Sequence, residues 1–508
     1  MHGLPPRKRS VTWRMVAPAL IFAFASVQFA IVLAEYYNVR LPVRLNVIWQ
    51  SGREQQPMPE LLAQAQLTDI PTAFSDPSAD NYRWYTEAKL RQLTACMTRR
   101  DCPPNADKIA IFASWHCQWA LYDNYRGGEG VWCSGMIRSL ERQGFTVLHG
   151  GDNDWRYIHH LHRQLGDMVR VVVADPGEEA HKGTFEQYQK SVSRPDGIPA
   201  WKWFRMAYYP TGESGVVGKA WMITAEPRFP RTEDLELVQS ASTPDDYTYG
   251  PSWFMTGHEE LQVKSALGEA DFTFLGYGIM PKPEDAVVVP WSERPNRVYI
   301  LAKQAHYFHN GHQHVYNFSF FEQAAEELGR EFPGFEFVGG FEDNRSDEDK
   351  EKWGPVPSVI KNFGLMNASR FDAECGQARL LLGIGSPPLS PSPYRALSRG
   401  VPFANPHTMR DNGDGWAYQQ HESMMDVPEP YVYQVEAFNY TSFVATIRKA
   451  LRTPIEPLRF ERMRQSTVDR RMHDWVTYDW RRLAAQILED RLAGNETQGG
   501  GSFRVFEL

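Results

Sequence analysis

The chain has 508 residues, 42% of them hydrophobic, and a formal net charge of −8. This length accommodates two or three domains with sizeable cores, and the acidic balance without a long basic block argues against a nucleic-acid-binding protein. The 16 tryptophans suit either a carbohydrate-binding surface or a large core.

The N-terminal part contains an uncharged apolar run at residues 15–34, MVAPALIFAFASVQFAIVLA. This run is long enough to cross a bilayer as a helix. Basic residues precede it at positions 7, 8, 9 and 14, so the positive-inside bias predicts that residues 1–14 form a cytoplasmic tail. We therefore predict a type II membrane anchor with the rest of the chain in a lumenal compartment. The alternative is a cleaved signal peptide, although no convincing small-residue cleavage site follows the run.

Residues 35–105 are polar and contain scattered prolines. We interpret them as a stem with some helix around residues 85–96. Such a segment would hold a globular domain away from the membrane.

The cysteines and glycosylation sequons agree with an oxidising compartment. Cys96 and Cys102 are close enough in sequence to form a small disulfide loop. Cys117 and Cys133 either pair or stay as buried thiols, and Cys375 is expected to be a free core thiol. Sequons for N-glycosylation occur at Asn317, Asn344, Asn367, Asn439 and Asn495.

Residues 106–290 are predicted to form a first α/β domain. Buried strands are expected at 109–114, 145–148 and 169–174, with helices at 131–144 and 154–167 between them. Alternation of strands and helices predicts a parallel, doubly wound sheet. The stretch from 182 to 278 is rich in Trp and Tyr and shows no clear periodicity.

Residues 291–455 are predicted to form a second α/β domain, and residues 456–508 to form C-terminal helices and a flexible tail. The terminal helices, within 466–492, are expected to pack back on the first domain. The elements expected in the second domain are strands at 298–302, 335–338 and 432–435 and helices at 320–332 and 440–451.

The second domain is organised around residues 378–406, ARLLLGIGSPPLSPSPYRALSRGVPFANP. This stretch is typical of a buried strand, a loop, a short helix and a second strand. Gly383 and Gly385 would let the backbone approach a ligand, and Ser390 or Ser392 would cap the helix. Amides at such a loop favour a phosphate. Two Rossmann-like units behind a predicted membrane anchor, in a lumenal compartment, suggest a sugar-nucleotide glycosyltransferase of the GT-B type, with the two domains facing across a cleft.

The same region resembles glycosyltransferase family 18, the alpha-1,6-mannosylglycoprotein 6-beta-N-acetylglucosaminyltransferases. The motifs that carry this resemblance are PSVIKNFGLMN (357–367), LLLGIGSPP (380–388), PSPYRALSRGVPFANP (391–406) and PYVYQVE (430–436), with a weaker match at GGEGVWCSGMIRSLERQGFTV (127–147). The resemblance implies an inverting, metal-independent transfer of GlcNAc from UDP-GlcNAc to the 6-hydroxyl of a mannose on N-glycans. Together with the predicted anchor, it implies a Golgi membrane location.

The resemblance also implies roles for particular residues. Glu129 matches the family's catalytic base, which accepts the proton of the acceptor hydroxyl. Without the resemblance, Glu129 is equally well explained as a glutamate favoured by the dipole at a helix start. The glycines and serines of the loop would meet the donor diphosphate. Lys303, at the end of a strand, would offset the diphosphate charge, or would be an ordinary solvated lysine.

The chain departs from the family pattern at two positions. Acidic residues are expected in the loop and on the following helix, where this sequence has Leu389 and Arg395. An arginine cannot accept a hydrogen bond from a ribose, but it can bind phosphate through two parallel hydrogen bonds. Two alternatives therefore stay open: a GT-B enzyme with another nucleotide-sugar donor, and a catalytically inactive glycan-binding relative.

Other clusters have less specific interpretations. Residues 152–154 (Asp-Asn-Asp) resemble the metal-binding DxD of GT-A enzymes, a fold in which a second α/β unit has no place. The histidines at 306, 309, 312 and 314 would line a polar interdomain loop, bind sugar hydroxyls or bind a metal. Trp201 and Trp203 would stack on sugars or pack in the core.

Overall fold

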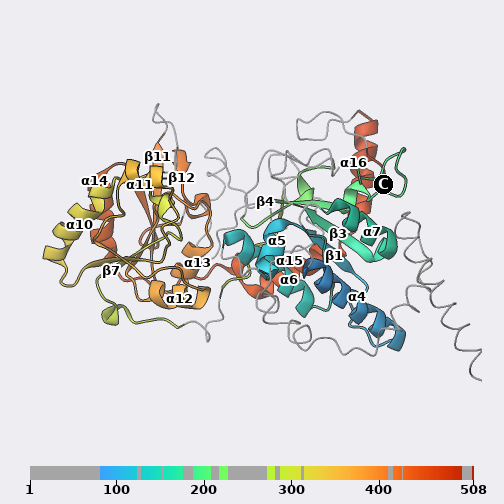
Figure 1. The fold of residues 1–508 in the computed structure, drawn as a ribbon, viewed down its shortest axis with the longest axis horizontal. Helices are drawn as coiled ribbons and strands as arrows, with labels where there is room; N and C mark the ends of the chain where they lie inside the picture. The colour runs from blue at the N-terminus through green and yellow to red at the C-terminus, as the bar shows by residue number, and fades with distance from the viewer. Residues whose placement is uncertain are drawn as a thin grey trace, which may run out of the picture.

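We describe a computed structural model of the chain. The structure describes residues 81–122, 127–151, 154–174, 187–207, 217–226, 272–280, 287–309, 314–409, 416–425, 427–494 and 506–508. Within these ranges the chain forms two α/β domains that lie side by side (Figure 1).

The first domain is built on a six-stranded parallel sheet with the order β2-β1-β3-β4-β5-β6. Its central strands, β1 and β3, consist almost entirely of Ile, Val, Ala and Phe and are buried along their length, as expected for a sheet covered on both faces. The strands are β1 (Ile109–Ala113), β2 (Thr146–His149), β3 (Val169–Ala174), β4 (Trp203–Ala207), β5 (Met222–Thr224) and β6 (Thr273–Phe274). The predicted parallel sheet is therefore confirmed.

Helices α5 (Trp115–Tyr122), α6 (Gly128–Arg142) and α7 (Trp155–Leu165) connect the first three strands. Helix α4 (Asn81–Arg99) also packs on this domain: the Thr86 hydroxyl donates to the carbonyl of His149 in β2, and the Tyr85 hydroxyl donates to Glu141 of α6. Residues 81–99 were included in the predicted stem, and the structure places them against the first domain.

The second domain contains a seven-stranded sheet with the order β12-β11-β10-β7-β8-β9, in which β13 also pairs with β11. All pairings are parallel except that of β12 with β11. The strands are β7 (Arg297–Ile300), β8 (Glu336–Gly339), β9 (Ile360–Asn362), β10 (Leu380–Leu382), β11 (Phe403–Met409), β12 (Trp416–Gln419) and β13 (Val432–Glu436). The helices are α10 (Phe318–Glu331), α11 (Asp347–Trp353), α12 (Ala368–Gly376), α13 (Ser392–Leu397) and α14 (Tyr440–Ala450).

The C-terminal helices return to the first domain, as predicted. In α15 (Gln465–Thr477), Asp469 accepts hydrogen bonds from Ser139 and Arg142 of α6. In α16 (Trp480–Leu492), Trp480 lies against Phe204 of β4 with ring centroids 4.8 Å apart. The chain thus crosses between the domains twice, once between β6 and β7 and once between α14 and α15, so two chain segments connect the domains.

One prediction about location is corrected. Among the helices of the described residues, none is long and apolar enough to cross a membrane, which contradicts a single-pass type II protein of the Golgi membrane. The apolar run at residues 15–34, on which that prediction depended, lies outside the described residues, as do the tail residues 495–505.

The five cysteines form two disulfides and one buried thiol. Cys96 bonds to Cys102, Cys117 bonds to Cys133, and Cys375 is a buried free thiol. The second disulfide joins α5 to α6. Two sequons are explained by helix capping, because the side chains of Asn367 and Asn439 accept backbone N–H bonds at the starts of α12 and α14.

The Cys117–Cys133 disulfide should stabilise the first domain. It closes a loop with a sequence separation of 16, and loops of this length contribute about 3 kcal/mol in the chain-entropy account. We expect a Cys117→Ala/Cys133→Ala variant to lose about 2–3 kcal/mol of unfolding free energy in chemical denaturation. The shorter Cys96–Cys102 loop, removed in the same way, is the matched control and should cost less.

A candidate active site between the two domains

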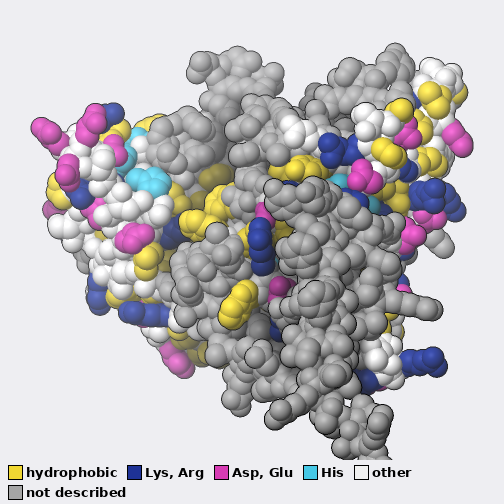
Figure 2. All heavy atoms as spheres, turned by 45° about the vertical axis from the view of Figure 1, so that its right-hand side comes forward, with side chains coloured by type: hydrophobic (Ala, Val, Ile, Leu, Met, Phe, Trp, Pro, Cys, Tyr) yellow, Lys and Arg dark blue, Asp and Glu magenta, His cyan; other side chains and the backbone are white. Residues whose placement is uncertain are grey.

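The carboxyl ends of the parallel strands in both sheets contribute to the junction of the domains. This is the edge at which ligands bind in open α/β sheets. From the first domain, β5 leads to Glu226 and β6 leads to Tyr277. From the second, β7 leads to Lys303 and β10 leads to the loop 383–392. Near the middle of Figure 2, hydrophobic side chains lie next to basic and acidic ones.

Glu129 lies in the first turn of α6, where the helix dipole favours a carboxylate. The charge of this carboxylate affects the pKa values of two side chains in the second domain. Burial lowers the pKa of Lys303, and the Glu129 charge opposes that shift. Burial also raises the pKa of Tyr307 to about 12, and Glu129 adds to that shift. Glu129 and Lys303, predicted from separate domains, therefore interact electrostatically in the structure.

The glycines of the loop are required by packing within the protein. A Cβ on Gly383 would lie 2.3 Å from Oε1 of Gln420, and the Gly383 amide donates to the carbonyl of Ala404. Gly385 has φ 92°, a left-handed conformation that favours glycine, and its amide donates to the same Gln420 oxygen at 2.9 Å. Gln420 therefore holds the loop from within, which the sequence did not suggest.

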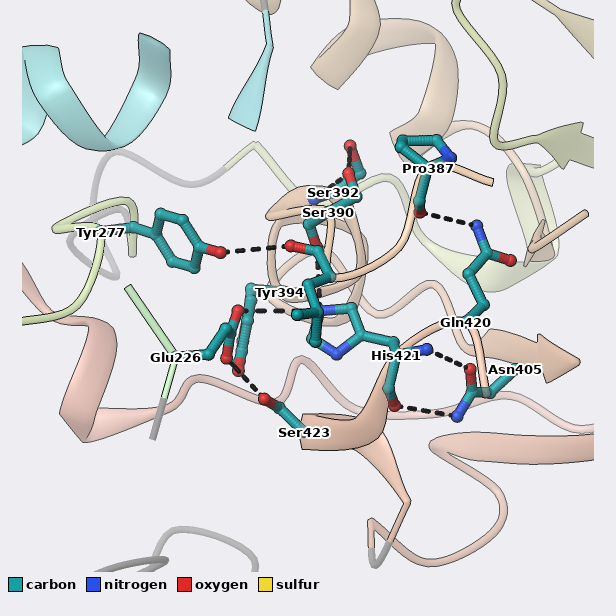
Figure 3. A network of polar contacts seen from close by, with 11 residues as sticks. Glu226, Tyr277, Pro387, Ser390, Ser392, Tyr394, Asn405, Gln420, His421 and Ser423 are labelled. Atoms are coloured by element: carbon teal, nitrogen blue, oxygen red, sulfur yellow. Dashed lines mark hydrogen bonds and ion pairs between the residues drawn. The ribbon is translucent and has the colours of Figure 1, made fainter. Parts of the chain in front are cut away.

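The two serines lie together at the start of α13. The Ser392 amide donates to Oγ of Ser390 at 3.3 Å, and the two hydroxyls are 3.1 Å apart (Figure 3). Neither is the N-cap: that position belongs to Pro391, which provides no side-chain hydrogen bond. The serines thus line the same turn of the loop.

Leu389 and Arg395 differ in their surroundings. Leu389 has φ 53°, which is uncommon for a residue with a Cβ, and its backbone is held from both sides. Its amide donates to the carbonyl of Gln420, and its carbonyl accepts from the Tyr277 hydroxyl at 3.2 Å. The Arg395 guanidinium donates two hydrogen bonds to the carboxylate of Asp372, so it is already engaged within the second domain.

A buried polar network, missed by the sequence analysis, lies beneath this loop. Glu226 is completely buried, and its Oε2 accepts hydrogen bonds from Tyr394 and Ser423, both at 2.6 Å (Figure 3). The other oxygen lies 3.8 Å from Nε2 of His421, and that ring N–H donates to the carbonyl of Ser390 at 2.9 Å. One carboxylate of the first domain thus contacts three side chains of the second.

Burial controls the protonation of this network. It raises the pKa of Glu226 to about 7, against the opposing hydrogen bonds from Ser423 and Tyr394 and the charge of Arg462. Burial also lowers the pKa of His421 to about 3, so the imidazole is neutral at physiological pH. Glu226 lies in the stretch without periodicity, and no sequence signal marked it.

The remaining residues singled out from the sequence contact neighbours within their own domains. Asp154 caps α7 by accepting from the Tyr157 amide, and residues 152–153 lie outside the described residues. His309 stacks on Trp353 with centroids 5.0 Å apart. Trp203 packs against Trp155 in the first domain. Within the described ranges, no cluster of three or more His, Cys, Asp or Glu is arranged to hold a metal ion.

Comparison with known proteins gives one sequence relative. No protein-family profile matches the chain. A stretch of 115 residues is 27% identical to the human alpha-1,6-mannosylglycoprotein 6-beta-N-acetylglucosaminyltransferase B, covering 20% of this chain and 14% of the human protein. The matched part is therefore a small fraction of that relative's length.

Similar solved structures cover more of the chain. AviGT4, a glycosyltransferase of avilamycin A biosynthesis, covers 76% of this chain and 98% of its own at 13% identity and TM-score 0.36. An O-GlcNAc transferase from Thermobaculum terrenum covers 89% and 81% at 11% identity and TM-score 0.36. The UDP-GlcNAc 2-epimerase from Neisseria meningitidis, bound to UDP-GlcNAc, covers 73% and 99% at 12% identity and TM-score 0.33. The α/β class of this chain rests on the strand order and register described above.

The raised pKa of Glu226 makes stability depend on pH. A carboxyl whose pKa rises from 4.5 to about 7 on folding contributes stability that is complete below pH 4.5 and is lost as pH rises to about 7. The loss should be on the order of 3 kcal/mol. We expect Glu226→Gln, which stays neutral, to remove this slope in denaturation curves recorded between pH 4.5 and 8. An unchanged slope in the variant would contradict this assignment.

Proposed function

We propose that this chain is an inverting GT-B glycosyltransferase related to family 18. In this proposal it transfers GlcNAc from UDP-GlcNAc to the 6-hydroxyl of a mannose on N-glycans without a metal ion. The observation that supports the proposal is the electrostatic interaction of Glu129, from the first domain, with Lys303, from the second. A carboxylate can take the acceptor proton, and an ammonium group can offset the charge of a leaving diphosphate.

The chemistry assigns one role to each side of the junction. Glu129 takes the proton of the acceptor hydroxyl while that oxygen forms a bond to C1 of the sugar. The bond between C1 and the diphosphate oxygen breaks on the opposite face, and UDP leaves with the electron pair. Lys303 and the loop hydroxyls of Ser390 and Ser392 offset the charge that develops on the leaving diphosphate. Gly383 and Gly385 shape the loop without donating their amides to the ligand.

A second candidate is the same reaction with another nucleotide sugar. The pairing of Arg395 with Asp372 favours it, because the helix position expected to accept from ribose hydroxyls presents a guanidinium instead. A screen of nucleotide-sugar donors by thermal shift separates the two candidates, since a bound donor stabilises the folded protein by mass action.

The Glu129→Gln variant tests the proposed base. We expect the rate of transfer from UDP-GlcNAc to fall by about 10²- to 10⁴-fold, because the acceptor proton then lacks a base. UDP binding should stay unchanged. The matched control is Glu326→Gln, an exposed glutamate of α10, which should keep full activity. Equal rates in Glu129→Gln and wild-type protein would refute the assignment.

Lys303→Met tests the donor side. Removing the charge-assisted contact should weaken UDP binding by about 10- to 100-fold, as measured by calorimetry. Wild-type transfer should also persist in EDTA. Dependence on added Mn²⁺ or Mg²⁺ would overturn the metal-independent mechanism.

A further inference from the structure

Helix α5 carries a group of aromatic side chains that the proposed reaction does not use. It begins immediately after the carboxyl end of β1, and Ser114 caps it by accepting a hydrogen bond from the Cys117 amide. Trp115 stacks on His116 with ring centroids 3.7 Å apart and meets Trp119 edge-to-face at 5.6 Å. We call these three residues the aromatic ledge.

The ledge occupies the outer face of its helix. Cys117 and Ala120 on the other face are buried in the core. Trp115 and His116 are half-buried, and the Trp119 side chain is 46% exposed. Contiguous apolar side chains at a surface mark interaction sites, whereas single exposed apolar residues are ordinary.

The helix that carries the ledge is fixed to the helix that carries the candidate base. Cys117, on the buried face of α5, is bonded to Cys133 of α6, and Glu129 lies in the first turn of α6. Figure 1 shows α5 and α6 on the side of the first domain that faces the second domain. The disulfide therefore holds the helix that carries the ledge against the helix that begins with the candidate base.

We propose that the aromatic ledge is a subsite that stacks a pyranose ring of the acceptor glycan. One face of such a ring presents C–H groups that pack on an indole, and its rim presents hydroxyls that the His116 imidazole can meet. The first domain holds the candidate base, so the acceptor must lie on this side of the junction. The inference rests on the proposed function, because it assumes that Glu129 acts on a sugar hydroxyl.

The test uses Trp119→Ala in the full chain with a mannose-terminated N-glycan as acceptor. We expect the acceptor KM to rise about tenfold while kcat and the KM for UDP-GlcNAc stay within twofold. Trp119→Phe, which keeps a ring, should recover most of the loss. The matched control is Trp84→Ala, since Trp84 is 63% exposed on α4 and should leave both constants unchanged.

Calorimetric binding of the free N-glycan separates this inference from the proposed function. Weaker glycan binding in Trp119→Ala, with normal binding in Glu129→Gln, supports the ledge even if no transfer from UDP-GlcNAc is found. Transfer that proceeds with an unchanged acceptor KM in Trp119→Ala overturns the ledge and leaves the proposed function standing. Equal loss in Trp84→Ala would also overturn it.

Discussion

The structure depends most on a carboxylate that the first domain places inside the second. Glu226 is fully buried, accepts hydrogen bonds from Tyr394 and Ser423, and faces His421. A buried charge is costly unless it is paired or neutralised, and burial here raises the pKa of Glu226 to about 7, so the carboxyl is mostly protonated below that pH. Such a contact fixes the relative position of two domains more strictly than apolar packing, because moving them apart would leave several polar groups unsatisfied.

That constraint extends to the loop of the candidate site. Tyr394 belongs to α13, and His421 holds the carbonyl of Ser390, so the network supports both ends of the short segment that carries the serines. Tyr277, also from the first domain, holds the carbonyl of Leu389. The loop is therefore positioned by the first domain as well as by its own sheet, and its geometry requires both domains in place.

The sequence predicted the architecture well because both sheets have strong local signals. Apolar strands such as Ile109–Ala113 and Leu380–Leu382, separated by amphipathic helices, define parallel sheets without long-range information. Glu129 at a helix start and Lys303 after a strand lie where these signals put them, while the catalytic role of Glu129 came from the family resemblance and stays a prediction. It did not find Glu226, Gln420 or His421, since a buried polar side chain is recognised only by the partners that folding brings to it. The glycines were predicted correctly as loop residues but for a different reason, because Gly383 makes room for Gln420.

We propose that the two domains share one ligand site, to which the first contributes Glu129 and the second Lys303. A crystal structure of the full chain with UDP bound would locate this site. We expect the diphosphate beside the Lys303 ammonium and the hydroxyls of Ser390 and Ser392, with the Glu129 carboxylate across an open space large enough for a sugar. UDP bound away from the domain junction, or with its diphosphate remote from Lys303, would refute a shared site.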